Sequence, residues 1–319
     1  MKKQIILSLI MLCGFSGVLK AHEGLEIDVE WTEAANANGL GQATGIAVDS
    51  HNHVFVFHRA NRTWGETMPT NPIDQNTVVM LDASTGKPLA EWGANRFIMP
   101  HGLSVDGSDN VWLTDVGGHT VQKFSHDGQH LLTLGVEGHA GNDSEHFNLP
   151  ADVDFSASGE IYIADGYANT RVIKFTAKGD YIAEWGNPGD EAGQFNLPHG
   201  IAVSDDGKVY VADRANSRLQ IFTETGEFLS LVDRALVRRP YGVALGPEGT
   251  VWVIDGGDQP NRTRAMVMGL SSDLKPLGVF DTNYDAVGRP LGHDIAVSPS
   301  GEIYVVDAWA NRVLKLKQK

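Results

Sequence analysis

Three histidines occupy the same position of a repeated segment in this sequence. His101, His199 and His293 each stand immediately before a short apolar stretch, reading GLSV, GIAV and DIAV. Three neutral imidazoles that converge from separate strands form a common zinc site with an open fourth position, as in catalytic zinc centres. A single such histidine is more often a hydrogen-bonded interior side chain, but the recurrence of three at one repeat position favours zinc. Other histidines fall in turns or loops and are expected to be ordinary surface side chains: His51, His53, His126, His130, His139 and His146.

Two arginines and a tyrosine follow the second strand of three repeats. Arg59 follows FVFH, Arg214 follows VYVAD, and Tyr167 follows IYIADG. Two guanidinium groups near a metal suit a carboxylate-bearing substrate, because arginine grips a carboxylate through two parallel hydrogen bonds. Their positive charge would favour the phenolate form of Tyr167, which makes it a candidate general base. In the alternative interpretation, the arginines pair with the aspartates that end the second strands, namely Asp115, Asp165, Asp213, Asp255 and Asp307.

Six similar segments must position these residues. Each has an apolar strand, a turn rich in Gly, Ser, Asp or Asn, and a second strand of alternating apolar residues, which together indicate a β-hairpin. The segments begin at Gly45, Gly102, Asp152, Gly200, Gly242 and Asp294. Third and fourth strands follow most of them, as in VIKFT and GDYIAEWG. Four antiparallel strands repeating about every 50 residues predict an all-β, six-bladed β-propeller, in which the histidines of blades two, four and six face one axis.

The two ends of the repeat array indicate how the ring closes. The sixth repeat stops after its third strand, VLKLK, whereas GLEIDVEW from Gly24 reads as a fourth strand without a blade of its own. We predict that this N-terminal strand completes the last blade, which removes exposed sheet edges. Residues 22–319 would then form a single propeller domain.

Residues 1–21 have the pattern of a secretory signal peptide, with two lysines, an apolar run and a small residue, Ala21, at the cleavage position. We therefore expect a secreted or periplasmic protein, and a monomer. Cleavage would remove Cys13, the one cysteine, so nitrogen and oxygen ligands would have to hold any metal. The formal charge of -15 disfavours nucleic acid as a partner, and no later segment is apolar enough to span a membrane.

Several motifs, in their order and spacing, resemble the peptidyl-α-hydroxyglycine α-amidating lyase family of NHL-repeat, six-bladed propellers. They are MPHGLSVDGSDNVWLTDV, DGYANTR, GQFNLPHGIAV and GHDIAV, and the similarity extends from about Glu26 to Lys317. The resemblance implies that the three histidines hold a catalytic zinc, that Tyr167 is the general base, and that Arg59 and Arg214 are active-site arginines. It also implies a calcium ion in the channel, bound by the backbone carbonyls of Ile46 and Leu103 and the carboxylate of Asp294.

The same resemblance implies cleavage of a carbinolamide, a carbon that carries hydroxyl, amide nitrogen and carboxylate, into glyoxylate and a primary amide. Zinc would ease the loss of the hydroxyl proton, which Tyr167 would accept. A peptide or a small carboxylate such as ureidoglycolate would suit these residues. Two other functions stay open. The first is lactone hydrolysis, which is disfavoured because calcium lactonases use carboxylate and amide ligands where this chain has histidines. The second is a non-catalytic secreted binding module.

Overall fold

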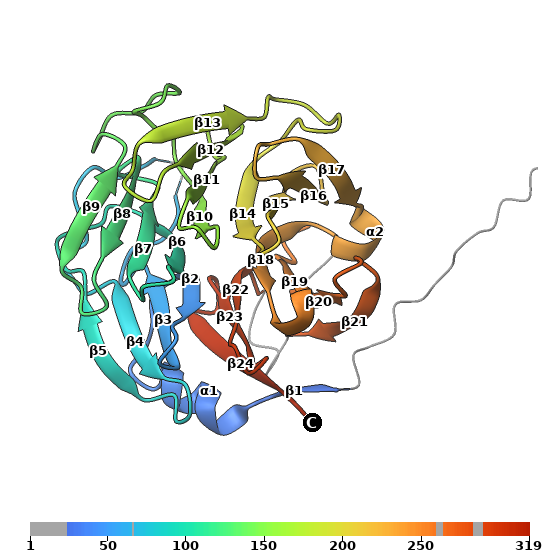
Figure 1. Cartoon of the computed structure of the whole chain (residues 1–319). Helices are drawn as coiled ribbons and strands as arrows, with labels where there is room; N and C mark the ends of the chain where they lie inside the picture. Colours follow the sequence, from blue (N-terminus) through green and yellow to red (C-terminus); the bar gives the residue numbers. More distant parts are fainter. Residues whose placement is uncertain (1–23, 66, 260–263, 283–289) are drawn as a thin grey trace, which may run out of the picture.

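Six antiparallel sheets of four strands each surround a central axis in the computed structural model of this chain (Figure 1). The structure describes residues 24–65, 67–259, 264–282 and 290–319. Successive first strands contact one another around the axis, and the last of them returns to the first. The predicted six-bladed β-propeller is therefore confirmed. The predicted signal peptide, residues 1–21, lies outside the described residues.

The strands take the same order in every blade, from the axis outward. The first strands are β2 (Ala43–Val48), β6 (Pro100–Val105), β10 (Asp152–Phe155), β14 (Pro198–Val203), β18 (Pro240–Leu245) and β22 (Gly292–Val297). The second are β3 (His53–His58), β7 (Val111–Asp115), β11 (Ile161–Asp165), β15 (Lys208–Asp213), β19 (Val251–Asp255) and β23 (Ile303–Asp307). The third are β4 (Val78–Asp82), β8 (Thr120–Phe124), β12 (Arg171–Phe175), β16 (Arg218–Thr223), β20 (Met266–Leu270) and β24 (Arg312–Gln318). The fourth are β5 (Pro88–Trp92), β9 (His130–Leu134), β13 (Tyr181–Trp185), β17 (Phe228–Val232), β21 (Pro276–Asp281) and, for the last blade, β1 (Leu25–Ile27).

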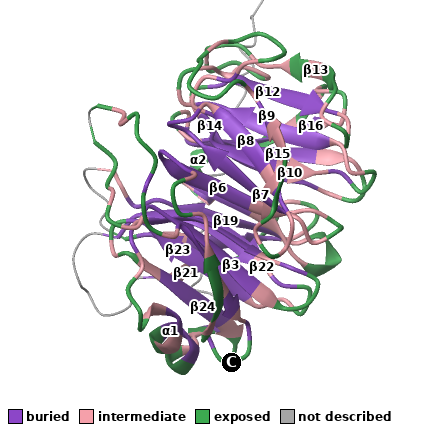
Figure 2. Cartoon of the chain, turned by 90° about the vertical axis from the view of Figure 1, so that its left-hand side faces the viewer, coloured by how far each residue is buried: buried purple, intermediate pink, exposed green. Residues whose placement is uncertain are grey.

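Burial follows this order, because each blade is covered on both faces by its neighbours while its outer edge meets water (Figure 2). Every residue of β7 and β11 is buried, whereas β5 and β13 are largely exposed. Both strands begin with an apolar run, VWL in β7 and IYIA in β11, and each ends in a buried aspartate.

The hydrophobic core is divided into six clusters, one for each interface between adjacent blades. Between blades one and six, for example, Val56 and Val79 pack against Tyr304 and Val306. Each fully buried side chain of this size contributes roughly 1.5–3 kcal/mol to stability. The blades are thus held by side-chain packing all around the axis, which makes the ends of the first strands rigid platforms.

The N-terminal strand completes the last blade, as predicted. β1 pairs antiparallel with β24, with Leu25 opposite Gln318 and Ile27 opposite Leu316. The predicted strand is too long, however, because α1 (Val29–Asn36) begins two residues after β1. Asp28 caps this helix by accepting the backbone N–H of Trp31 at 3.4 Å.

Trp31 explains why the chain turns into a helix here. Its indole N–H donates to the carbonyl of Asp82 in blade one at 3.1 Å, and its ring packs 5.2 Å from that of Tyr304 in blade six. The helix therefore covers the junction at which the ring closes. The other helical segments are short: α2 (Arg234–Val237) and a 3₁₀ turn (Pro247–Gly249).

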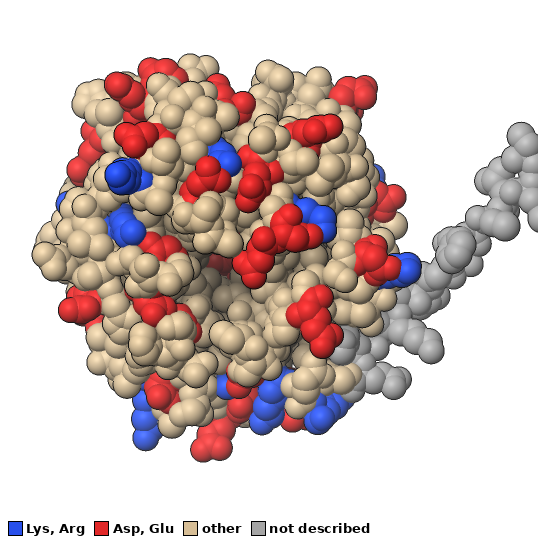
Figure 3. Space-filling model, viewed as in Figure 1, with Lys and Arg blue, Asp and Glu red and all other residues tan. Residues whose placement is uncertain are grey.

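Acidic side chains predominate on the face of the ring in Figure 3, and the centre of that face is hollowed. This agrees with the formal charge of -15. Within the described ranges, no helix has the length and apolar character needed to cross a bilayer.

Candidate active site and metal centre

The three predicted metal ligands meet at one end of the central channel. His101 lies on β6, His199 on β14 and His293 on β22. Their ring centroids are 4.8 Å (His101 to His199), 4.6 Å (His101 to His293) and 5.0 Å (His199 to His293) apart, and one ring nitrogen of each lies within 4.8 Å of the others. All three side chains are buried. We call these residues the axial triad.

Backbone carbonyls of the intervening blades orient the triad. The Nδ1–H of His101 donates to the carbonyl of Ala151 at 2.7 Å, and that of His293 donates to the carbonyl of Thr44 at the same distance. The Nδ1–H of His199 donates to the carbonyl of Tyr241 at 2.8 Å. Because a carbonyl only accepts, each neutral ring carries its proton on Nδ1 and keeps the Nε2 lone pair for a ligand. Such fixed tautomers are typical of metal-binding histidines.

Burial keeps the triad neutral. Removal from water lowers the pKa of all three imidazoles well below the usual value, and nearby positive charge lowers it further. After burial, the next cause differs among the three. His293 lowers the pKa of His101, His101 lowers that of His199, and Arg59 lowers that of His293. Neutral imidazole is the form that binds a metal, so all three rings are in the protonation state that a metal site requires.

The hydroxyl of Tyr167 lies at the open side of the triad. It is 2.9 Å from Nε2 of His101 and 3.1 Å from Nε2 of His199. A phenol has one proton and can satisfy one of these two lone pairs, so the second contact brings two lone pairs together. A metal ion would accept the imidazole lone pairs instead. Three nitrogen donors fit a tetrahedral zinc ion, whose fourth position would stay open beside the hydroxyl.

A tight turn after β11 brings Tyr167 to this place. A side chain on Gly166 would collide with the carbonyl oxygen of Pro198, 1.7 Å from the position of its Cβ, so the turn needs glycine. The backbone N–H groups of Tyr167 and Ala168 donate to the carbonyls of Leu149 and Asn148. These contacts tie the turn to the segment that leads into β10.

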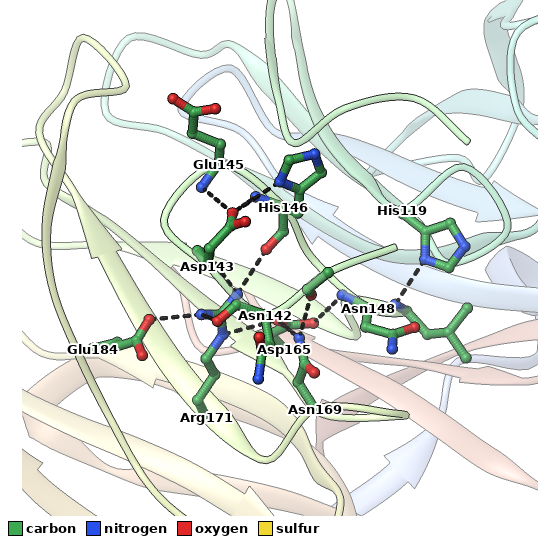
Figure 4. Close-up of polar contacts among 12 residues, drawn as sticks. His119, Asn142, Asp143, Glu145, His146, Asn148, Asp165, Asn169, Arg171 and Glu184 are labelled. Carbon is green, nitrogen blue, oxygen red and sulfur yellow. Dashed lines mark hydrogen bonds and ion pairs between the residues drawn. The ribbon is translucent and has the colours of Figure 1, made fainter. Parts of the chain in front are cut away.

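A polar network around Asp165 flanks the same turn (Figure 4). Asp165 accepts from Asn169 at 2.6 Å and from Arg171 at 3.0 Å. Arg171 also donates to Glu184 and to the carbonyls of Asn142, Asp143 and His146. The network thus joins the end of β11 to the loop between β9 and β10.

The other aspartates that end second strands also have partners of this kind. Asp213 pairs with Arg218, Asp255 with Arg238 and Asp307 with Arg312, and Asp115 accepts the backbone N–H groups of Ile98 and Met99. These carboxylates hold the blades, as their recurrence suggests. The contacts of Arg59 and Arg214 are different.

Arg59 is a buried guanidinium held by neutral groups. Its Nε donates to the carbonyl of Pro100 at 3.0 Å, one Nη donates to the side chain of Gln42 at 2.9 Å, and the group lies 5.0 Å from the ring of Trp64. Burial lowers its pKa to about 10, although the nearby Tyr167 opposes this shift. A desolvated cation without a carboxylate partner among these contacts is prepared to bind an anion.

Arg214 contacts the tyrosine directly. One Nη lies 3.4 Å from the hydroxyl of Tyr167, the other donates to the hydroxyl of Tyr241, and the guanidinium stacks 3.8 Å from the ring centre of Tyr241. Asp258 lies 3.6 Å from Arg214 and accepts the hydroxyl proton of Tyr241 at 2.6 Å. Burial alone would lower the pKa of Arg214, but Tyr167, Tyr241 and Asp258 together raise it.

Sequence reasoning assigned no role to Tyr241 and Asp258. Tyr241 stands at the position that histidine occupies in blades two, four and six, so its repeat position was the available signal. Asp258 follows a Gly-Gly turn and has no counterpart in the other blades.

These residues line a pocket of about 300 Å³. Its polar lining includes His293, Tyr167, Arg59, Arg214 and the carboxylate of Asp258. Trp64 and Trp309 belong to its wall and are 39% and 45% exposed, so an aromatic surface leads from solvent to the axial triad.

On the other side of the triad, the channel holds buried carboxylates. Asp294 accepts the backbone N–H of Ile46 at 3.0 Å, and Asp152 accepts that of Ile201 at 3.0 Å. Burial raises the pKa of Asp294 to about 7. The pKa of Asp152 rises well above its usual value through burial and the charge of Asp294. The three residues predicted for a second cation, Ile46, Leu103 and Asp294, all line this stretch of about 290 Å³.

Asp152 is a further carboxylate at this level that sequence reasoning missed. The signal was present, because blades three and six have aspartate where the other four repeats have glycine. Blades three and six lie opposite each other in the ring, so the two carboxylates meet across the axis.

Comparisons with known proteins identify relatives of this chain. The NHL repeat family matches residues 97–124 and 195–222. The chain is 34% identical to peptidyl-glycine alpha-amidating monooxygenase B of Xenopus laevis, over 93% of this chain and 36% of that protein. It is 35% identical to peptidyl-alpha-hydroxyglycine alpha-amidating lyase 1 of Drosophila melanogaster, over 88% of this chain and 58% of that protein. The chain therefore spans from about a third to somewhat over half of these relatives.

Among solved structures, a streptogramin B lyase superposes with a TM-score of 0.61 at 15% sequence identity, covering 94% of this chain and all of that one. This similarity concerns the fold alone.

Proposed function

Because this chain belongs to the peptidyl-α-hydroxyglycine α-amidating lyase family, we propose that it is a metal-dependent carbon–nitrogen lyase acting on carboxylate-bearing carbinolamides of the peptidyl-α-hydroxyglycine type. The products would be glyoxylate and a primary amide. One observation carries this proposal: the hydroxyl of Tyr167 contacts two Nε2 atoms of the axial triad and Arg214, inside a pocket that a second buried arginine lines.

The Nε2 atoms of His101, His199 and His293 would hold zinc. When bound, zinc would act as a Lewis acid that makes the carbinol proton easier to remove. The donor set supports zinc over harder cations, because imidazole nitrogen suits zinc whereas calcium and magnesium prefer oxygen.

Tyr167 would accept the carbinol proton as the general base. The electrons of the O–H bond then form the carbonyl of glyoxylate, the C–N bond breaks, and the amide nitrogen takes up the proton. Arg214 supports this role by position, since its guanidinium lies 3.4 Å from the phenol oxygen and would hold that oxygen beside the triad. Tyr241 and Asp258 would hold Arg214 in position.

Arg59 and Arg214 would bind the substrate carboxylate. Both line the pocket, and the Arg59 guanidinium is buried with neutral partners on Nε and one Nη. Bringing a carboxylate to such a group gives a charge-assisted pair in a poorly solvated site, where it is strong.

Calcium would occupy the channel below the triad, held by the carbonyls of Ile46 and Leu103 and the carboxylate of Asp294. The raised pKa values of Asp294 and Asp152 support a cation here, because a divalent ion between two buried carboxylates would remove their repulsion.

The proposal also includes the processing of the chain. Residues 1–21 would be a signal peptide, residues 22–319 a single domain, and the mature protein a secreted or periplasmic monomer. Mass spectrometry of the protein expressed with its leader would test the cleavage site, and light scattering would test the monomer.

A glyoxylate assay tests the function. The purified chain should release glyoxylate from α-hydroxyhippurate, lose this activity on metal removal, and regain it with zinc. Ureidoglycolate in the same assay separates a small-substrate lyase from a peptide-type one. A protein that binds zinc at the triad and releases glyoxylate from neither compound would instead be a binding module or a lactonase.

A further inference from the structure

A second group of potential metal ligands lies where hairpin turns of blades one and two meet. Asp49 and His53 flank the turn between β2 and β3, and His126 lies in the turn between β8 and β9. The Oδ2 atom of Asp49 is 2.9 Å from Nδ1 of His53 and 2.8 Å from Nε2 of His126, and these two nitrogens are 3.1 Å apart. We call these three residues the rim cluster.

The rim cluster is separate from the axial triad. β2 begins beside the triad end of the channel and β3 returns to it, so the turn that joins them lies at the opposite end of the blade. β8 runs from the same end as the triad to the turn that carries His126. The two groups therefore lie on opposite faces of the ring.

The spacing of the three atoms suits a single metal ion. Ligands about 2.0–2.2 Å from a tetrahedral or octahedral metal lie roughly 3.0–3.5 Å from one another. The three contacts in the rim cluster, 2.8–3.1 Å, need an expansion of a few tenths of an ångström at most to match.

Surrounding contacts hold the ligands in place before any metal arrives. The second carboxylate oxygen of Asp49 accepts the backbone N–H groups of His51 and His53 at 2.9 and 2.7 Å, and the side chain of Asp49 is fully buried. The ring of Phe55 packs edge-on against that of His126 at 5.4 Å. An oriented, buried carboxylate beneath two imidazoles lowers the entropic cost of binding.

The cluster is open to solvent on its outer side. The side chains of His53 and His126 are 26% and 31% exposed. His51, at 63% exposure, has a ring nitrogen within 4.8 Å of ligand atoms of Asp49 and His126 and could provide a fourth ligand after a rotation of its side chain. An ion could therefore enter without opening the fold.

We propose that Asp49, His53 and His126 form a second binding site for a divalent transition metal, with His51 or water completing the coordination. Two imidazoles and a carboxylate favour zinc, cobalt or nickel over calcium or magnesium. Because the ligands come from adjacent blades, the metal would link blade one to blade two and stabilise the ring without taking part in catalysis.

Metal stoichiometry of the full chain tests the proposal. The protein is stripped with a chelator and titrated with Co²⁺ near neutral pH, with absorbance as the readout, and with Zn²⁺ followed by dialysis and elemental analysis. The double variant His53→Gln/His126→Gln should bind one equivalent fewer than the parent. A matched double variant of exposed histidines, His130→Gln/His139→Gln, should bind as the parent does. His199→Ala should lose a different equivalent.

The decisive comparison is between the two double variants, so it does not depend on whether the axial triad binds metal. Equal stoichiometry for the parent and His53→Gln/His126→Gln overturns the proposal. Circular dichroism tests whether each variant is folded. If the double variant is unfolded, the single variant His126→Gln, in a surface turn, is compared with the parent instead.

Discussion

The axial triad and the rim cluster use the same side chain in different surroundings. In the triad, each imidazole is buried and donates Nδ1–H to a backbone carbonyl of the next blade. In the rim cluster, two partly exposed imidazoles share one buried carboxylate oxygen. Burial and fixed tautomers make the triad suited to chemistry, because a low-dielectric pocket strengthens the interactions of a bound metal. An exposed site joining two turns is suited to a stabilising role.

The largest expected effect is the loss of the triad. His199→Ala should lower kcat/KM by at least ~10³-fold, since Lewis-acid stabilisation by zinc is worth several kcal/mol. His53→Gln/His126→Gln should leave kcat/KM unchanged. Steady-state kinetics of the two variants test this difference. If the rim variant lost as much activity as the triad variant, the distinction between a catalytic triad and a stabilising rim cluster would be wrong.

Tyr167→Phe should keep the metal and lose turnover. Removal of a general base costs about 10²- to 10⁴-fold in kcat. Tyr181→Phe is a suitable control, because Tyr181 is 44% exposed on an outer strand. Glyoxylate release is measured beside metal content, and undiminished activity of the phenylalanine variant would refute the assignment of Tyr167 as the base.

A third histidine environment sharpens the comparison, because His58 is buried and its Nδ1 accepts backbone N–H groups. Burial lowers its pKa from 6.5 to about 4. Between pH 6.5 and pH 4, His58 is protonated in the unfolded chain but stays neutral in the folded protein. The free energy of unfolding is therefore unaffected by His58 above pH 6.5 and decreases as the pH falls toward 4. At pH 4.5 the loss should be about 2.5 kcal/mol.

His58→Asn tests this prediction. The amide oxygen can still accept the backbone N–H groups of Gly41 and Ala60 that His58 accepts through Nδ1. Denaturant unfolding at neutral and acid pH should show a smaller loss of stability in the variant than in the parent. A parallel loss in both proteins would contradict the shift.

The smallest expected effect is stabilisation by metal at the rim cluster. In a His199→Ala background, zinc at tenfold excess over its Kd should raise the free energy of unfolding by about 1.4 kcal/mol. Adding His53→Gln/His126→Gln should abolish this rise. Thermal unfolding with and without zinc measures it, and an equal shift in both proteins would place the bound zinc elsewhere.

Much of the fold and of the triad could be predicted because the sequence repeats define the blades and the equivalent positions within them. His101, His199 and His293 stand at one repeat position, and rotation about an axis turns that regularity into proximity. The same signal was available for Asp152 and Asp294, which replace glycine in opposite blades, and for Tyr241. The helix at Val29–Asn36 could not be predicted, because Trp31 is held by groups of blades one and six that are distant in sequence.

The prediction that the turn and loop histidines are ordinary surface side chains needs correction for His53 and His126. Both are partly buried and converge on Asp49. No repeat position relates them, since His53 follows a first hairpin turn and His126 lies in an outer turn of the next blade.

The amino-acid sequence by itself therefore determined the number of blades, the closure of the ring by the N-terminal strand and the side chains that face the axis. All of these follow from the periodicity of apolar residues and from the residues that differ from the repeat pattern at equivalent positions. Tertiary structure alone decided the hydrogen-bonded tautomers of the triad, the arrangement of Tyr241 and Asp258 around Arg214, and the rim cluster. These depend on contacts between blades, where distances between side chains are set by packing and have no trace in the spacing along the chain.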